Sequence, residues 1–336
     1  MLFLLLLQNL HHPLQPPPSA PADFRKRAHT YSIVAYDSVT GDLGIAVQSK
    51  FPNVGGLVPW ARAGIGAVAT QSLSNTDYGE KGLELLFEGA TAPEAMRIVM
   101  RRDPRPAQRQ VGMVDAHGNA ASWTGDSTFD WAGGRTGGGA DGRTGGKGAL
   151  ITGRWYAAQA NIMVSDATVR NMAETFERTR GSLADRLVAA LVAGQAGGGD
   201  KRGMQSAALL VVRAGAGYMG LNDRYIDIRV YDAPDPIREL QRLYELHKLY
   251  FFTTDSADLV PITPALQREL EAILLKEPVN QAEKWLAAPQ SSLNATFLNA
   301  LANFMYWENY DVRVRMDGKI DRVALDDIRK NRRPRR

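Results

Sequence analysis

Thr30 offers the most specific chemistry in this chain, because it opens the first strand-like segment. Residues 31–36 and 43–48 are rich in β-branched, aromatic and small apolar side chains. Residues 37–42 between them contain Asp and Gly, so the pattern predicts a β-hairpin. Thr30 is then either an ordinary residue of a core hairpin or a nucleophile that is exposed when everything before it is removed.

Two glycine-rich segments match nucleotide-binding motifs only in part. Residues 64–69 (GIGAVA) fit the loose dinucleotide fingerprint, but these glycines lie inside a strand-like run. Beside Lys147, Gly148 stands where a phosphate loop needs Ser or Thr, and Asp141 replaces its first glycine. No nucleotide cofactor is therefore expected. Residues 133–153 are predicted to form a glycine-rich surface loop, with a lid over a pocket as the functional alternative.

Composition excludes several further classes of function. The chain has no cysteine, which rules out disulfides, thiolate catalysis and Cys-ligated metals. Its five histidines are few and, apart from His11-His12 in the N-terminal extension, separated, so no metal site is predicted. The formal charge is +4, but the last eight residues carry six Lys and Arg. Removing these six charges leaves a body of about −2. We therefore expect no nucleic-acid binding.

The first 29 residues are not expected to join the folded core. Residues 1–10 are a short apolar run, and residues 11–22 are rich in proline. The apolar run is too short to span a bilayer, so no transmembrane segment is expected there. It is similar to the apolar region of a secretory signal, with Ala20-Pro21-Ala22 as the cleavage site. This interpretation favours a secreted or periplasmic protein, and a mistaken start codon with a true start near His29 is the alternative.

The order of the predicted elements favours antiparallel sheets covered by helices. Strand-like segments occur in groups and helical segments in pairs, which is typical of α+β folds. From residue 235 onward, apolar residues recur at helical spacing and predict a small helical domain. We divide the chain into an extension (1–29), an α+β domain (30–232), a helical domain (235–328) and a basic tail (329–336).

Several ordered segments of the first domain resemble a known bacterial family. The matching segments are residues 30–35 (TYSIVA), 44–51 (GIAVQSKF), 58–64 (VPWARAG), 66–71 (GAVATQ), 109–112 (RQVG) and 203–208 (GMQSAA). They resemble the domain of unknown function 1028. That family is similar to the N-terminal nucleophile hydrolases, so the resemblance implies a four-layer αββα sandwich with the hairpin at its centre.

The resemblance also implies a mechanism and a set of site residues. In such hydrolases the first residue of the mature chain is the nucleophile and its own α-amine is the base, which assigns catalysis of amide hydrolysis to Thr30. A cation beside that amine is expected, and Lys50 and Arg62 are the candidates. Gln71 and Ser206 lie where strand ends would line the substrate cleft. A small-molecule or peptide-like substrate, no cofactor and a homodimer are expected.

One feature departs from the logic of that superfamily. Thr30 follows Ala28-His29, and cleavage after Ala22 would leave Asp23 first. Unless the bond between His29 and Thr30 is cut, the amine of Thr30 is blocked. The alternative function is then a protein that binds a small molecule or a cell-wall fragment without turnover.

The C-terminal segment carries a second resemblance. Residues 304–328, with Trp307-Glu308-Asn309-Tyr310 and Gly318-Lys319-Ile320-Asp321, resemble a peptidoglycan-binding module that accompanies this family. The resemblance implies peptidoglycan as a partner. Dimerisation or control of substrate access is equally compatible with these residues.

Overall fold

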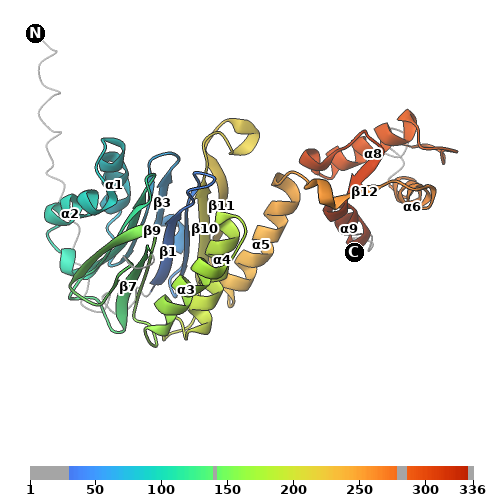
Figure 1. Cartoon of the computed structure of the whole chain (residues 1–336). Coiled ribbons are helices and arrows are strands. Elements are labelled where there is room, and N and C mark those ends of the chain that lie inside the picture. The colour runs from blue at the N-terminus through green and yellow to red at the C-terminus, as the bar shows by residue number, and fades with distance from the viewer. Residues whose placement is uncertain (1–29, 139–141, 278–285, 332–336) are drawn as a thin grey trace, which may run out of the picture. The chain divides into compact units, whose positions relative to one another are not determined.

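The computed structural model describes residues 30–138, 142–277 and 286–331. The chain divides into two compact units, with the boundary after Ile237, and each unit is described by itself (Figure 1). The first unit contains a large antiparallel sheet and two pairs of helices. The second unit consists mainly of helices.

The sheet of the first unit has eleven strands, all of them paired antiparallel. Along its main path the strand order is β11-β10-β2-β1-β9-β6-β5-β4-β3, while β7 pairs with β9 and β8 pairs with β7. The predicted hairpin is confirmed as its first two strands. The strands are β1 (Thr30–Tyr36), β2 (Leu43–Ser49), β3 (Pro59–Arg62), β4 (Gly66–Ser72), β5 (Arg109–Asp115), β6 (Asn119–Thr124), β7 (Ala132–Gly137), β8 (Thr144–Gly145), β9 (Ala149–Asn161), β10 (Ser206–Val212) and β11 (Arg224–Val230).

Strand β9 joins two parts of this sheet and lets it curl. Its first six residues pair with β6, and Tyr156–Asn161 pair with β1. Between these stretches Trp155 has a φ of 73°. The two parts face each other across one apolar core, which contains Val34 and Ile45 from one part and Val114 and Ala120 from the other.

Helices cover the outer faces of the two parts (Figure 1). Helices α1 (Asp77–Phe87) and α2 (Ala92–Arg102) contact β4, β5 and β6, while α3 (Ala167–Arg178) and α4 (Leu183–Ala196) contact β1 and neighbouring strands. In β1 the side chains alternate between the helices and the inner core, and Tyr31 donates a hydrogen bond to the side-chain oxygen of Gln195 at 3.2 Å. Burial on both faces explains why β1 is continuously apolar from Ile33 to Ala35. The expectation of a mixed α and β domain with antiparallel strands is confirmed.

The prediction that residues 133–153 form a surface loop is wrong for most of that segment. It contains most of β7, all of β8 and the start of β9, while residues 139–141 lie outside the described part. The glycines serve close packing: a Cβ on Gly153 would lie 2.3 Å from the carbonyl oxygen of Gly137, and a Cβ on Gly134 would lie 2.6 Å from the hydroxyl of Ser122. Here glycine permits close strand contacts and does not mark a flexible loop.

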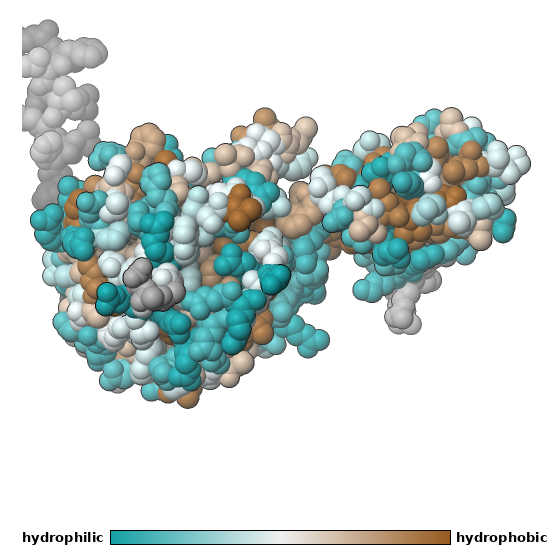
Figure 2. Space-filling view, viewed as in Figure 1, coloured by the Kyte–Doolittle hydropathy of each residue, from teal (hydrophilic) through white to brown (hydrophobic). Residues whose placement is uncertain are grey.

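The second unit has its own apolar core. Its elements are most of α5 (Pro236–Phe251), β12 (Leu259–Pro261), α6 (Pro264–Leu274), α8 (Ala295–Trp307), β13 (Lys319–Asp321) and α9 (Arg322–Lys330). The helices agree with the sequence pattern, but the small β12-β13 sheet was not expected. A buried ion pair joins Arg313 to Asp321 at 2.7 Å. The face of this unit seen in Figure 2 mixes apolar and polar residues.

In the part of the chain that the structure describes, every helix is too short or too polar to cross a membrane.

A substitution at Gly112 tests the close packing between the two parts of the sheet. A Cβ on this residue would lie 2.2 Å from the side-chain oxygen of Gln159, whose amide donates to the hydroxyl of Ser32 at 2.7 Å. We expect Gly112→Ala to destabilise the first unit by about 1–3 kcal/mol, the range for overpacked cores. Gly146→Ala is the control, because a Cβ there would meet nothing within 4 Å. Urea denaturation compares the two variants, and equal stability would contradict this packing role.

Candidate functional site

Thr30 lies in a row of polar side chains that crosses four strands. It pairs with Ser49 on β2 and with Asn161 on β9, and Ser49 pairs in turn with Ser206 on β10. Directly opposed residues of antiparallel strands project on the same face of a sheet. Strand register therefore gathers three hydroxyls and one amide at the edge where β1 begins.

Three hydrogen bonds hold Thr30 in place. Its hydroxyl lies 3.0 Å from the hydroxyl of Ser49. Its carbonyl oxygen accepts hydrogen bonds from the side-chain amides of Gln71 at 3.1 Å and Asn161 at 3.3 Å. Thr30 is only 4% exposed. Its hydroxyl and its carbonyl oxygen nevertheless both have hydrogen-bond partners, as buried polar groups usually do.

The buried side chain of Gln110 holds Gln71 and Asn161 in position. The Gln110 side-chain oxygen accepts from the Gln71 amide at 2.7 Å and from the Asn161 amide at 2.9 Å. The Gln110 amide donates in turn to the carbonyl of Ala160 at 2.8 Å. Gln71, Gln110 and Asn161 are fully buried, so their hydrogen bonds are shielded from water and orient the start of β1 strongly.

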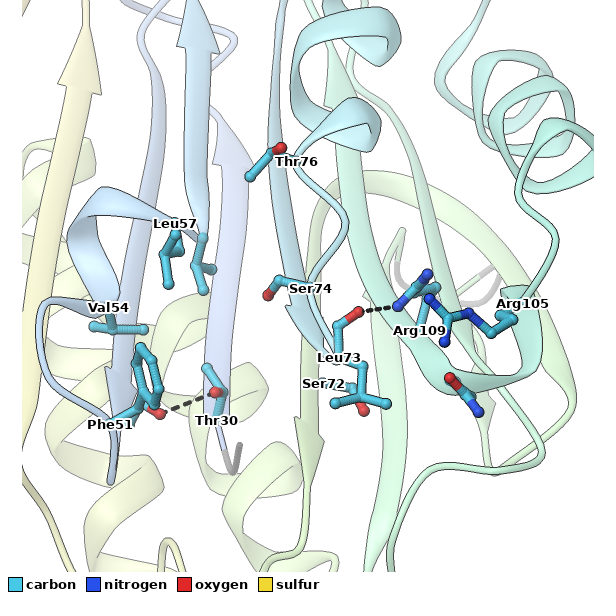
Figure 3. A pocket seen from close by; sticks show the side chains of 13 residues that line it. Thr30, Phe51, Val54, Leu57, Ser72, Leu73, Ser74, Thr76, Arg105 and Arg109 are labelled. Carbon is cyan, nitrogen blue, oxygen red and sulfur yellow. Dashed lines mark hydrogen bonds between the residues drawn. The ribbon is translucent and has the colours of Figure 1, made fainter. Parts of the chain in front are cut away.

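Thr30 and Ser49 also line a pocket of about 270 Å³. In Figure 3 the labelled side chains of Phe51, Val54 and Leu57 lie on one side of Thr30, and the two arginines lie on the other side, where Leu73 also lies. This volume lies just below the roughly 300–1,000 Å³ that is typical of ligand pockets, so the pocket has room only for a small ligand. The other lining residues are Phe51, Val54, Leu57, Val58, Ser72, Leu73, Ser74, Thr76, Arg105, Gln108 and Arg109.

The arginine side of the pocket depends on a buried carboxylate. Asp103 accepts from the Arg109 side chain at 2.7 Å and 3.3 Å, and Arg109 also donates to the carbonyl of Leu73. Burial alone raises the pKa of Asp103, but hydrogen bonds from Arg109, the Arg105 backbone and Asn75 outweigh it, so the pKa lies below its ordinary value. Asp103 thus stays charged and fixes the guanidinium of Arg109.

The structure brings together only some of the residues that the sequence singled out. Gln71 contacts Thr30, as described above. Ser206 does not line the pocket, but its hydroxyl donates to the carbonyl of Phe51 and accepts from the amide of Val54 at 3.1 Å. It therefore shapes the loop that forms the apolar wall.

The two predicted cations lie outside the pocket lining. The ammonium group of Lys50 donates to the carbonyl of Met204 at 3.1 Å. Arg62 stacks on Phe87, 4.2 Å from the ring centroid, and pairs with Gly66 at the far end of β4. Gln71 lies five residue positions beyond Gly66, which is about 17 Å along a strand. That separation gives Arg62 no direct contact with Thr30.

Sequence reasoning missed several residues of this site. Ser49 stands inside the GIAVQSKF segment, but its contact with Thr30 follows only from strand register. Asn161 belongs to none of the matching segments and could likewise have been found only from strand register. Arg109 and Gln110 stand inside the RQVG segment, but nothing in their spacing indicated a pocket. Arg105 lies in the connection between α2 and β5 and gave no signal.

Within residues 30–138, 142–277 and 286–331, no group of three or more His, Cys, Asp or Glu side chains could hold a metal ion.

These features define a mixed α/β protein with a large curled antiparallel sheet and a small pocket at the start of its first strand. Residues 30–240 match the model of a family of unknown function, DUF1028, and the chain belongs to this family. It is similar to the crystal structure of a DUF1028 protein from Silicibacter pomeroyi, with 28% identity and a TM-score of 0.55 over 68% of this chain and 92% of that one. Comparison with curated proteins gave no match.

The Asp103–Arg109 pair predicts a pH-dependent contribution to stability. Because the pKa of Asp103 is lowered on folding, its stabilising effect is present above its ordinary pKa of about 4 and is lost as the pH falls through the lowered value. We expect Asp103→Asn to destabilise the protein by about 3 kcal/mol at pH 7, because Arg109 would stay buried without its partner. The difference in the free energy of unfolding between Asp103→Asn and the wild type should become smaller toward pH 2.

Urea denaturation at pH 7 and at low pH measures both effects. Asp77→Asn is the control, because Asp77 forms an exposed ion pair with Lys81 on α1. Such a pair contributes at most about 1 kcal/mol. A constant difference between Asp103→Asn and the wild type across this pH range would contradict the role given to the carboxylate.

Proposed function

We propose that the first unit is a hydrolase of an amide or related bond, with Thr30 as its N-terminal nucleophile. The observation that carries this proposal is the position of the Thr30 hydroxyl, which lines a small pocket at the start of β1. The DUF1028 match likewise begins at residue 30. The two facing parts of the sheet, with α1 and α2 outside one and α3 and α4 outside the other, are compatible with a four-layer αββα sandwich.

The chemistry requires a free α-amine on Thr30. An α-amine has an ordinary pKa near 8, so a useful fraction is neutral near pH 7 and can accept the hydroxyl proton. The Thr30 oxygen would then attack the carbonyl carbon of the substrate and form an ester with the acyl group. The amine passes the proton to the leaving nitrogen, and water later cleaves the ester.

The surroundings of Thr30 suit this role. The hydrogen bond with Ser49 can orient the Thr30 hydroxyl oxygen. The side-chain amides of Gln71 and Asn161 donate to the Thr30 carbonyl oxygen and hold the backbone in place. None of these three hydrogen bonds uses the nitrogen of Thr30. Removing the preceding residues would therefore leave them intact. Lys50 remains a prediction as the cation that acts on the amine, whereas the position of Arg62 at the far end of β4 does not support that role.

Binding without turnover is the second candidate function. It needs only the pocket, and the pocket does not require cleavage before Thr30. In an uncut chain the nitrogen of Thr30 is part of a peptide bond and cannot act as a base. The protein would then bind a small molecule or a cell-wall fragment on the same framework.

Mass spectrometry of native protein and one pair of variants separate these functions. We expect a mature chain that begins at Thr30. Thr30→Ala should abolish turnover of any amide that the wild type hydrolyses, while the melting temperature changes little, because only one hydrogen bond worth about 1 kcal/mol is lost. Thr30→Ser should retain part of the activity. A native chain that keeps His29, or full activity in Thr30→Ala, would refute the nucleophile role.

For the second unit we propose peptidoglycan binding. Support comes from the resemblance of residues 304–328 and from exposed aromatic side chains of α8, since Tyr306 and Trp307 are 52% and 59% exposed. Aromatic rings with one open face are common in binding surfaces. A role in dimerisation or in control of substrate access is the alternative.

Sedimentation with purified sacculi tests this proposal. We expect the full chain to sediment with sacculi and a chain truncated after Asp235 to remain in solution. Tyr306→Ala with Trp307→Ala should weaken retention at least fivefold, whereas Val323→Ala, an exposed change on α9, should not. Equal retention of the full and the truncated chain would refute wall binding by this unit.

A further inference from the structure

The pocket at Thr30 has two chemically different walls. The loop after β2 and the short helix η2 (Val54–Gly56) supply apolar side chains, namely those of Phe51, Val54, Leu57 and Val58. The connection between α2 and β5 supplies Arg105 and Gln108, and the first residue of β5 supplies Arg109. Figure 3 shows the labelled members of these walls on opposite sides of Thr30. A ligand that spans the pocket would meet an apolar surface at one end and positive charge at the other.

Only one of the two arginines on this side of the pocket is paired with a carboxylate. The pocket lining contains two arginines and no carboxylate. Asp103, just behind it, binds the guanidinium of Arg109 through two hydrogen bonds. Arg105 donates only its backbone amide to Asp103, and among the residues that the structure describes no ion pair or hydrogen bond involves its guanidinium. Its exposed side chain is therefore the positive charge available to a ligand.

Gln108 adds an unused polar atom to the same wall. Its side-chain oxygen is buried and accepts no hydrogen bond within the described part of the chain. Buried polar atoms are nearly always paired, so an unpaired one in a pocket lining is a candidate contact for a ligand. An amide N–H is a group that this oxygen could accept from.

We propose that the pocket takes N-acyl amino acids, with a short apolar acyl chain against Phe51, Val54, Leu57 and Val58 and with the free carboxylate at Arg105. Guanidinium and carboxylate form charge-assisted hydrogen bonds with matching planar geometry. The scissile amide would then lie near the Thr30 hydroxyl. This assignment of substrate class rests on the proposed hydrolase function, whereas the ligand preference can be measured without it.

The reaction balances as a hydrolysis. The Thr30 oxygen forms an ester with the acyl carbon as the C–N bond breaks, and the proton of its hydroxyl reaches the amino acid nitrogen by way of the α-amine. One water molecule then cleaves the ester. The products are a short carboxylic acid and a free amino acid, and the Thr30 hydroxyl is restored.

Binding to the full chain carrying Thr30→Ala tests the ligand class without turnover. The probes are N-hexanoylglycine, the neutral N-hexanoylglycinamide and the shorter N-acetylglycine, measured by titration calorimetry. We expect N-hexanoylglycine to bind at least tenfold more tightly than either other compound. Equal affinity for the acid and its amide, or no binding of N-hexanoylglycine, would overturn the proposal.

Variants of Arg105 test whether this residue causes the preference for the acid over the neutral amide. Added to Thr30→Ala, Arg105→Ala should weaken binding of N-hexanoylglycine at least tenfold and abolish the preference for the acid, and Arg105→Lys should restore part of it. Arg101→Ala is the matched control, since Arg101 is an exposed arginine at the end of α2 that does not line the pocket. An equal effect of Arg105→Ala and Arg101→Ala would overturn the role of Arg105.

Assays with the mature chain that starts at Thr30 separate this proposal from the proposed function. Charge-selective binding with no release of hexanoate from N-hexanoylglycine would refute the hydrolase function and leave the ligand class supported. Hydrolysis of the acid and its amide at equal rates would support the hydrolase function and overturn the substrate class proposed here.

Discussion

The clamp on the carbonyl of Thr30 is the interaction on which the site depends. Two side-chain amides, from Gln71 on β4 and Asn161 on β9, donate to this single oxygen, and Gln110 on β5 holds both of them. Because all three side chains are fully buried, each amide left without its partner would carry a desolvation cost of about 1–3 kcal/mol. The start of β1 is therefore fixed by the two facing parts of the sheet together.

The same curl of the sheet makes the pocket possible. On one side, Ser206 ties the loop after β2 to β10 and so fixes the apolar wall. On the other side, Asp103 holds Arg109 and leaves Arg105 beside it exposed. Hydrogen bonds that contact no ligand thus decide which chemical groups face the Thr30 hydroxyl. The pocket's asymmetry follows from these supports and not from the strand residues alone.

Sequence patterns found the local elements well and the long-range contacts poorly. The hairpin was recognised from its β-forming residues and the Asp and Gly between them, and helices were recognised from apolar residues at helical spacing. Thr30 and Gln71 were singled out as site residues, and they are in contact. The glycine-rich segment was misjudged because glycine marks both turns and strands that pack closely, and only the neighbouring strands distinguish the two.

The sequence by itself determined that Thr30 opens the first strand, that cysteine chemistry is absent and that the chain belongs with DUF1028 through its ordered segments. The tertiary structure alone decided what surrounds Thr30. Its partners Ser49, Gln71 and Asn161 lie 19, 41 and 131 residues away along the chain. The physical reason is that secondary structure follows from residues a few positions apart, whereas strand register and the curl of the sheet bring distant residues together.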